Sequence, residues 1–303
     1  MEEKTALSST DVASTITATA DTATLQLIPA TVTEIKGVRV FDVGQGDCIG
    51  LRDQNDEVCC YVDYGGNEYH PDQSNPSRTA SRLPVQAGSH YVPVILTHWD
   101  KDHYWSANKK NPAAQKCEWL VPRQLVSPQA TRFAAKLANA KCWPESIGNQ
   151  AVSFAVGTDD EVEIRKCAAF PANAQKEDRN HSGLAINLTH KPEDGTVTHM
   201  LLPGDCAFDR IPNLPAKLSL RAIVAYHHGA STDWCTATEQ TLANAYSPYV
   251  MAYSYGTHSP GKKNHYGHPN RSNYQSCHPN WDIGAITTED IRAKGLDSSD
   301  LDW

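Results

Sequence analysis

The sequence predicts an α/β protein in which two mixed β-sheets pack face to face and helices cover their outer surfaces. Segments rich in β-branched and apolar residues fall into two sets, one in the first hundred residues and one from Ala151 onward. Helical segments lie between and after these sets, which is the order expected when helices flank two packed sheets. The 303 residues are enough for one large α/β domain or two small ones.

The first set of expected strands consists of short runs dominated by apolar and β-branched residues. Turn-forming residues at 53–56 separate two of these runs and predict a β-hairpin. A helix is expected over Pro128–Ala140, because Phe133 and Leu137 have the i, i+4 spacing of one helix face. The expected strands are Val38–Val43, Cys48–Arg52, Val58–Val62 and Tyr91–Leu96.

The second set has the same composition and is followed by further helical segments. Helices are expected over Thr238–Tyr246 and Thr288–Lys294. The expected strands are Ala151–Val156, Val162–Cys167, Leu184–Thr189, Val197–Leu202, Ala222–Tyr226 and Tyr249–Tyr253.

The two ends of the chain differ in composition from the segments between them. Residues 1–33 are rich in Ser, Thr and Ala and lack the basic start and apolar core of a secretory signal, so we expect a flexible leader. Short strand pairing by Leu25–Thr33 is the alternative. Residues 34–303 are expected to form a single hydrolase domain, with the acidic tail Asp297–Trp303 on its surface.

Composition limits the classes of partner and the compartment. The formal net charge of −8 argues against tight non-specific binding of nucleic acid by the whole surface, but it is compatible with a local basic groove. No apolar run approaches the ~20 residues needed to cross a bilayer, so no membrane partner is expected. The nine cysteines form no CxxC pair, and their odd number favours reduced thiols in the cytoplasm.

The segment after the expected strand Tyr91–Leu96 contains four candidate metal ligands within six positions. These are His98, Asp100, Asp102 and His103. A loop at a strand end is held rigidly by its sheet, and two carboxylates so close repel each other unless a cation or proton lies between them. A solvated polar turn would explain an isolated HxD pair, whereas the full HxDxDH pattern favours a dinuclear metal site.

Three further segments place candidate ligands next to expected strands. Asp205 follows Val197–Leu202 through a Pro-Gly turn, a position that is by itself more typical of a turn residue. His227 and His228 follow Ala222–Tyr226. Consecutive side chains cannot face the same way on an extended chain, so we expect one histidine to bind metal and the other to form a hydrogen bond or face substrate. His181 precedes the next expected strand.

The order of five short segments resembles that of the metallo-β-lactamase superfamily. They are residues 41–47, 61–66, 96–103, 202–205 and 226–229. The most similar branch is the metallo-hydrolase domain of ComEC, the competence DNA-uptake protein, with its stand-alone relatives. That branch is marked by DVGQGD, here residues 42–47, and by Asp where most members have a second His, here Asp100. A late YGHP element at 266–269 also matches, and the resemblance spans about residues 36–282.

The resemblance implies an αββα sandwich with two divalent metal ions at one edge, between the sheets. It implies that one metal is held by His98, Asp100 and His181, the other by Asp102, His103 and one of His227 and His228, and that Asp205 bridges them. His228 matches the superfamily's His-Gly motif. Asp63 would orient the HxDxDH loop from behind, and the glycines of 44–46 would let the first hairpin approach the site. Asp42 and Asp47 are expected to form turns.

The ligand set also predicts a type of reaction. Two divalent ions can share a hydroxide and neutralise a phosphodiester during in-line attack, and a mixed carboxylate–imidazole set suits zinc or manganese. We therefore expect a dinuclear phosphodiester hydrolase, a nuclease that cleaves DNA or RNA through a metal-bound hydroxide. The candidate catalytic residues are Asp102 and His268. Lys262, Lys263 and His265 could contact the substrate phosphate, although a polar loop without function fits this segment equally well.

Two other functions compete with a nuclease. One is a hydrolase of a small or lipid-linked substrate, such as a phosphocholine ester, cyclic nucleotide, lactone or β-lactam. The acidic composition supports it, and Trp99, Tyr104 and Trp105 beside the metal loop could line a compact pocket. The other is a metal-stabilised binding module without turnover, which is disfavoured because every expected ligand position holds a competent residue.

Overall fold

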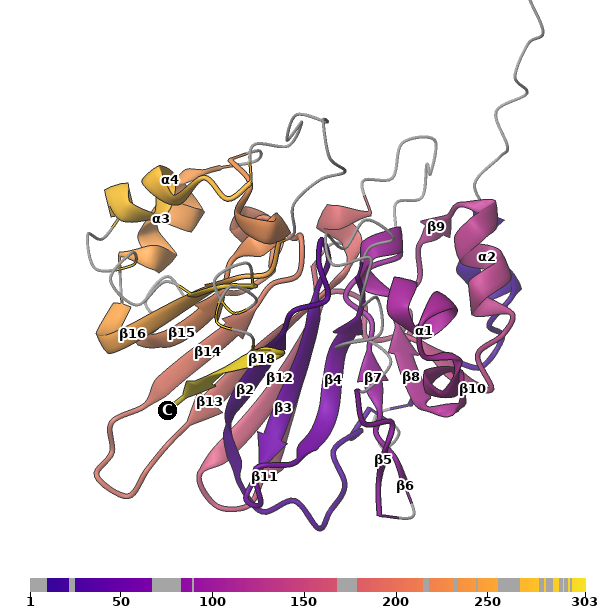
Figure 1. Cartoon of the computed structure of the whole chain (residues 1–303), viewed down its shortest axis with the longest axis horizontal. Helices are drawn as coiled ribbons and strands as arrows, with labels where there is room; N and C mark the ends of the chain where they lie inside the picture. Colours follow the sequence, from indigo (N-terminus) through magenta and orange to yellow (C-terminus); the bar gives the residue numbers. More distant parts are fainter. Residues whose placement is uncertain are drawn as a thin grey trace, which may run out of the picture.

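The protein is described here by a computed structural model (Figure 1). The described residues are 10–21, 25–66, 83–88, 90–167, 179–214, 218–231, 234–243, 245–255, 268–277, 281, 286–288, 291, 294 and 296–303. No helix in this part of the chain is long and apolar enough to span a membrane. All nine cysteines are free thiols.

The first sheet contains seven strands and combines parallel and antiparallel pairs. Its order is β10 (Asn139–Cys142), β8 (Glu118–Val121), β7 (Val94–Ile95), β4 (Val58–Tyr64), β3 (Cys48–Asp53), β2 (Ile35–Phe41) and β18 (Ser298–Asp302). The strands from β10 to β4 are parallel, whereas β3, β2 and β18 continue the sheet with antiparallel pairing. The expected hairpin is β3–β4.

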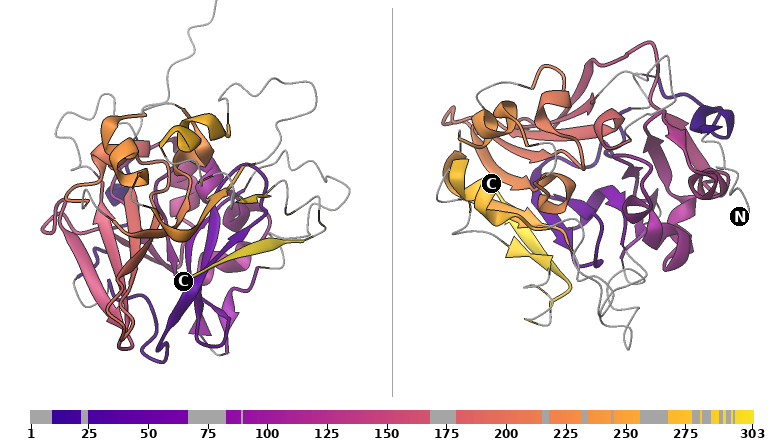
Figure 2. Two further views of the ribbon diagram at one scale, coloured as in Figure 1. Left: turned by 90° about the vertical axis from the view of Figure 1, so that its left-hand side faces the viewer. Right: turned by 90° about the horizontal axis from the view of Figure 1, so that it is seen from above.

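The second sheet also contains seven strands of mixed direction. Its order is β11 (Ala151–Val156), β12 (Asp160–Lys166), β13 (Leu184–His190), β14 (Thr198–Leu202), β15 (Leu220–Val224), β16 (Ala245–Tyr253) and β17 (Ile286–Thr287). Pairing is antiparallel from β11 to β14 and parallel from β14 to β17. The two sheets form separate layers in Figure 2.

The main hydrophobic core lies between the two sheets. On β2, Val38 and Val40 point into it while Arg39 between them pairs with Asp300, which is the alternation expected of a strand with one buried face. The same buried cluster contains Val62 and Ile95 from the first sheet and Ile164, Ile186, Met200 and Val224 from the second. Face-to-face packing of the sheets is therefore confirmed.

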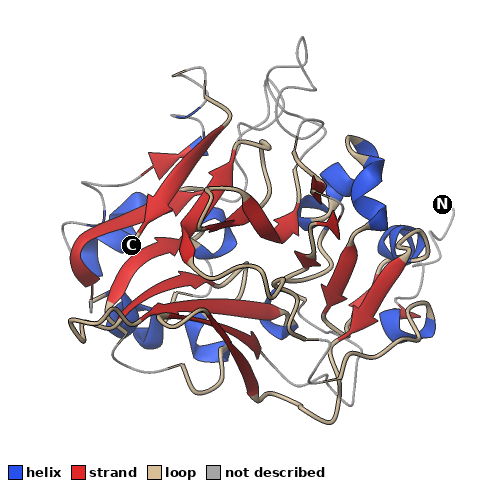
Figure 3. Ribbon diagram, turned by 90° about the horizontal axis from the view of Figure 1, so that it is seen from below, coloured by secondary structure: helices blue, strands red, loops and turns tan. Residues whose placement is uncertain are grey.

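Short helices cover the outer faces. Helices α1 (Trp105–Lys109) and α2 (Pro128–Ala134) lie over the first sheet, where Phe133 joins a buried cluster with Tyr61 and Trp119. Helices α3 (Thr236–Leu242) and α4 (Arg271–Cys277) lie over the second, where Leu242 and Tyr274 pack with Ile223. Figures 1 and 3 show the two helix pairs on opposite sides of the strands. The predicted αββα sandwich is confirmed.

Two expected helices are shorter than predicted because strand pairing takes over their last residues. The helix expected over Pro128–Ala140 ends at Ala134, and Asn139–Cys142 forms β10 beside β8. The helix expected over Thr238–Tyr246 ends at Leu242, and β16 begins at Ala245. In both cases tertiary pairing overrides a favourable local helix propensity. Of the expected strand Tyr91–Leu96, only Val94–Ile95 forms a strand (β7) of the first sheet.

Part of the segment expected to be a flexible leader packs on the domain. Strand β1 (Thr10–Asp11) pairs with β9 (Leu125–Val126), and Asp11 accepts hydrogen bonds from Arg123. Val12 and Leu25 are fully buried. A Ser/Thr/Ala-rich composition did not reveal these contacts, because they depend on a few apolar residues spaced along a polar segment.

The acidic tail lies largely at the surface, as expected, but it forms the edge strand β18 of the first sheet and buries one apolar residue. In β18, Leu301 is 1% exposed and belongs to the inter-sheet core. The acidic residues Asp300 and Asp302 pair with Arg52, and Asp300 also binds Arg39. The negative charges that suggested solvent exposure are thus matched by arginines of β2 and β3.

Candidate metal centre

Loops from both sheets meet at one edge of the sandwich, where the parallel strands end. The HxDxDH loop follows β7 of the first sheet, Asp205 follows β14, and His227 and His228 follow β15. Leu184 at the start of β13 donates its backbone N–H to the carbonyl of Thr97 (2.7 Å), which joins the two sheets beside the loop. The carboxyl ends of parallel strands are a common position for functional sites in α/β proteins.

Asp63 fixes the HxDxDH loop from below. It is fully buried, and its carboxylate accepts hydrogen bonds from the backbone N–H and the hydroxyl of Thr97, both at 2.7 Å. His103 Nδ1 lies 2.7 Å from Asp63 Oδ2, and because a carboxylate can only accept, Nδ1 carries the proton. In the neutral imidazole, His103 Nε2 is therefore left with the lone pair, which a metal ion can bind in place of a second proton.

The two consecutive histidines lie in a left-handed turn. His227 (φ 45°, ψ 48°) and His228 (φ 55°, ψ 22°) adopt a conformation that non-glycine residues rarely occupy. The sequence interpretation, in which one histidine binds metal and the other forms a hydrogen bond or faces substrate, assumed an extended chain, and this assumption about the backbone was wrong. His228 Nδ1 donates to the carbonyl of Ser254 (2.8 Å), so in the neutral imidazole the lone pair is on Nε2.

Asp205 lies at the centre of four imidazoles. Its Oδ2 is 3.5 Å from His98 Nε2 and 3.6 Å from His227 Nε2, and its Oδ1 is 3.3 Å from His103 Nε2. His228 Nε2 lies 3.7 Å from Asp205 Oδ1 and 3.2 Å from Asp102 Oδ2. The structure thus brings together six of the ligands predicted from the sequence, from three separate loops.

The donor atoms at this centre match what a metal ion requires. The Nε2 atoms of His98, His103 and His228 and the Oδ1 of Asp205 are buried and make no hydrogen bond. Donor atoms within 4.8 Å of one another form the groups His98–His103–Asp205 and Asp102–His103–His228. Buried polar atoms are almost always satisfied, so converging acceptors without donors fit a cation.

The charges of the centre also favour a cation. Burial, reinforced by nearby His103, lowers the pKa of His98 to about 4, so this imidazole is neutral and able to bind metal at neutral pH. Burial acts against protonation of His103 as well, but the carboxylates of Asp205 and Asp63 outweigh it and hold the His103 pKa well above its usual value. Positive charge is thus favoured where the Nε2 atoms converge.

Other predicted ligands lie further from this cluster. Asp100 Oδ2 is 3.8 Å from His98 Nε2, and Arg179 donates to Asp100 Oδ1 at 2.6 Å. His181 lies in the single turn Asn180–Ser182. Within the described part of the chain, the close donor groups include neither Asp100, His181 nor His227. Gln124 links the two loops by bonding to Trp99 N, Arg179 O and the hydroxyl of Ser182.

His268 lies beside the paired histidines. It is 6% exposed, and its ring centroid is 5.4 Å from that of His227 and 5.7 Å from that of His228. Asn270 N–H donates to the carbonyl of Gly229 (2.7 Å) and ties this segment to the histidine turn. Lys262, Lys263 and His265 lie outside the described residues.

Asp47 is a site residue that the sequence interpretation placed in a turn. It is 1% exposed, with Oδ1 3.5 Å from His228 Nδ1 and Oδ2 3.9 Å from His103 Nδ1. It belongs to close donor groups with Asp63–His103 and with Asp205–His228. The signal was its position between Gly46 and β3, since β3 pairs antiparallel with β4 and so begins at the edge where β4 and β7 end.

Glycines allow the hairpin to approach the centre, as expected. A Cβ on Gly46 would lie 2.2 Å from the carbonyl oxygen of Asp102, and one on Gly65 would lie 1.8 Å from the same atom. Both values are far inside van der Waals contact, so no side chain fits at either position.

Among the comparisons with known proteins, only the search of solved structures found similar proteins. No family model and no curated protein sequence matches the chain. The metallo-β-lactamase MIM-1 from Novosphingobium pentaromativorans is 12% identical, over 74% of this chain and 88% of its own, with a TM-score of 0.33. A CmlA β-hydroxylase mutant is 11% identical, over 88% and 54% of the two chains, with a TM-score of 0.40. A flavodiiron protein from Giardia intestinalis is 11% identical, over 58% and 40%, with a TM-score of 0.29.

Proposed function

We propose that the protein is a metal-dependent phosphodiester hydrolase that acts on nucleic acid. The observation that carries this proposal is the convergence of three buried, unbonded imidazole Nε2 atoms on the carboxylate of Asp205. Two divalent ions, zinc or manganese, are the cofactors that this set of donors suits.

The residues of the chain divide into ligands and groups that hold them. His98, Asp102, His103, Asp205 and His228 would bind the ions, with Asp100, His181 and His227 as further ligands. Asp63 and the carbonyl of Ser254 hold the Nδ1 protons of His103 and His228, so that both rings present Nε2. When bound, the ions would activate water and neutralise charge on a phosphoryl group.

Proton transfer is assigned to residues at the margin of the cluster. Asp102 has a side chain that is 31% exposed, whereas His98, His103 and Asp205 are almost fully buried. Asp102 therefore lies where substrate and water can reach the centre. His268 lies beside His227 and His228, where it could protonate a leaving oxygen.

Nucleic acid is proposed as the substrate from the resemblance to the ComEC-like branch, which residues 42–47 and Asp100 carry. The structure does not support the compact aromatic pocket that was expected for a small-substrate hydrolase. Trp99 and Tyr104, 2% and 1% exposed, belong to a core cluster, and Trp105, the first residue of α1, is 6% exposed, so all three are too buried to line an open pocket.

The proposal is tested with protein purified without chelator and loaded with Mn²⁺ or Zn²⁺. We expect more than one equivalent of metal and cleavage of bis(p-nitrophenyl) phosphate and of DNA or RNA. Rapid hydrolysis of a small ester or of nitrocefin, with nucleic acid untouched under either metal, would replace the nuclease by a small-substrate hydrolase. Metal binding without any hydrolysis would leave a binding module.

A paired variant tests the role of His268. His268→Ala should lower turnover while metal content stays unchanged, because the proposed role of this side chain is proton transfer. His90→Ala, an exposed histidine on β6 (His90–Tyr91), is the matched control and should leave both unchanged.

A further inference from the structure

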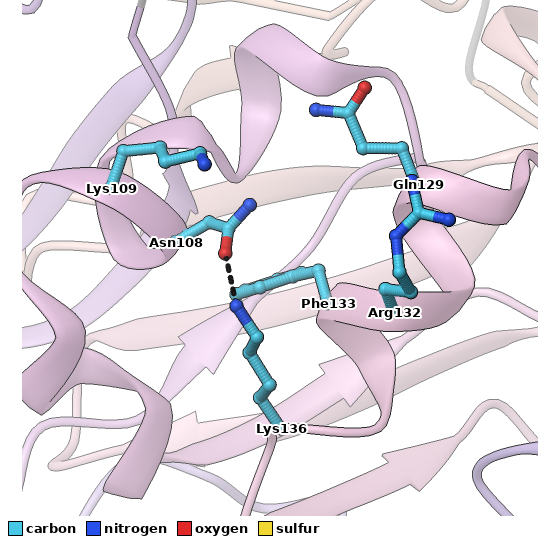
Figure 4. Close-up of a pocket in the computed structure, with 6 residues that line it drawn as sticks. All are labelled: Asn108, Lys109, Gln129, Arg132, Phe133 and Lys136. Carbon is cyan, nitrogen blue, oxygen red and sulfur yellow. Dashed lines mark hydrogen bonds between the residues drawn. The ribbon is translucent and has the colours of Figure 1, made fainter.

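A cavity lies between α1 and α2, with the turn that follows α2 at one side. It has a volume of about 210 Å³ and is lined by Asn108, Lys109, Gln129, Arg132, Phe133 and Lys136. Figure 4 shows Lys136 pointing from the end of α2 toward Asn108 of α1, where its ammonium donates to Oδ1 at 3.1 Å. The ring of Phe133, 1% exposed, packs beneath these polar groups. We call this cavity the α1–α2 pocket.

The charge of the α1–α2 pocket is positive and uncompensated. No ion pair joins Lys109, Arg132 or Lys136 to a carboxylate in the described part of the chain, and no carboxylate lines the pocket. The surrounding stretch from His103 to Pro144 contains seven Lys or Arg residues and one acidic residue, Glu118, which pairs with Lys141. Such a concentration of cations stands out in a chain of net charge −8.

The α1–α2 pocket lies close along the chain to the candidate metal centre. Helix α1 begins at Trp105, two residues after His103. Tyr104 between them stacks on Phe133, with ring centroids 4.6 Å apart and planes 9° from parallel. One buried, stacked ring pair therefore lies between the HxDxDH loop and the pocket, whose cations Lys109, Arg132 and Lys136 are exposed to solvent.

We propose that the α1–α2 pocket binds a backbone phosphate of the nucleic-acid substrate, away from the bond that is cleaved. This inference rests on the proposed function and names how its substrate is held. Lys and Arg with the amides of Asn and Gln are the side chains that bind backbone phosphates without reading sequence. The planar guanidinium of Arg132 can donate two parallel hydrogen bonds to one phosphate, while Lys109 and Lys136 add point charges.

The experiment measures binding in metal-free protein, so that hydrolysis plays no part. A fluorescent single-stranded oligonucleotide is titrated at several salt concentrations into the wild type and into Lys136→Ala, Arg132→Ala and Lys116→Ala. Lys116→Ala is the matched control, since it removes an exposed lysine of the same basic stretch outside the pocket. We expect Lys136→Ala and Arg132→Ala each to weaken binding about five- to tenfold and to reduce the slope of log K against log salt by about 0.7.

Two further measurements separate the possible outcomes. Equal affinity and equal salt slope for all four proteins would overturn the pocket proposal. Inorganic phosphate that shifts the side-chain amide NMR signals of Asn108 and Gln129, with no shift from oligonucleotide, would assign the pocket to free phosphate and overturn the nucleic-acid source. Failure of the loaded wild type to cleave any phosphodiester contradicts the proposed function, whereas the binding comparison remains a separate result.

Discussion

Carboxylates of three kinds surround the buried histidines, and each kind has a different consequence when it is removed. Asp63 holds a proton on a ring nitrogen, Asp205 faces the free ring nitrogens, and Asp47 lies behind two rings at once. Loss of a carboxylate that faces the free nitrogens removes negative charge from the position that a cation would occupy. Loss of a carboxylate behind the rings changes only the orientation and basicity of the imidazoles.

Asp205→Asn should abolish metal binding and lower hydrolysis by roughly a thousandfold, because it removes the carboxylate shared by four imidazoles. Elemental analysis and the phosphodiester assay measure both effects. Asp209→Asn changes a carboxylate four residues away that is 46% exposed, and it should behave as the wild type. Normal metal content in Asp205→Asn would contradict the central role of this residue.

Asp47→Asn should weaken metal binding by about 10- to 100-fold without unfolding the protein, since Asp47 orients His228 and His103 from behind. A metal titration followed by calorimetry measures the affinity. Asp53→Asn, at the far end of β3 from Asp47, should leave the affinity unchanged. If Asp47→Asn binds metal as tightly as the wild type, Asp47 is a turn residue as the sequence suggested.

Among the elements, the loops of the site depend on close backbone approach. Gly65→Ala should destabilise the protein by about 2–3 kcal/mol and weaken metal binding, because its Cβ would strike the carbonyl oxygens of Asp102 and Asp47. Gly195→Ala is the control for backbone strain alone, since Gly195 has φ +81° and open space around its Cβ position. Denaturant unfolding with a metal titration distinguishes the two variants.

The last strand contributes to the core although its sequence looks exposed. Leu301→Ala should lower the free energy of unfolding by about 2–4 kcal/mol, because Leu301 is 1% exposed between the sheets. Leu296→Ala removes the same group from a residue that is 55% exposed and should change stability by less than about 0.5 kcal/mol. Equal stability of the two variants would mean that β18 does not dock in solution.

Secondary-structure elements set by local sequence pattern could be predicted, whereas those set by distant partners in the chain could not. Strands with a strong local pattern, such as Ala151–Val156, were predicted with their observed bounds. Asn139–Cys142 and Ser298–Asp302 were missed because their strand character comes from partners, Glu118 for Lys141 and the arginines of β2 and β3 for the tail. The left-handed turn at His227 and His228 was missed for a similar reason, since no glycine marks either position.

For the whole molecule, the candidate metal centre joins the two sheets. Asp102 and His103 come from the first sheet and Asp205 and His228 from the second, so metal binds only when both are docked. Metal at about 100 times its Kd should raise the unfolding free energy by about 3 kcal/mol and the melting temperature by about 5–10 °C. Calorimetry with and without chelator measures the shift. Asp205→Asn should show none, and a wild type that melts at one temperature in both conditions would contradict a metal bridge between the sheets.

Because β18 pairs with β2 but is the last strand of the chain, β2 is synthesised well before its partner. Arg39 and its partner Asp300 are separated by 261 residues, so β2 leaves the ribosome roughly 10 to 50 seconds before the strand that covers it. During that time β2 is an open edge, which can template pairing with another chain. Lys36 and Arg39 place positive charges along this edge and disfavour such pairing. The arginine that later binds Asp300 thus first protects the nascent sheet from aggregation.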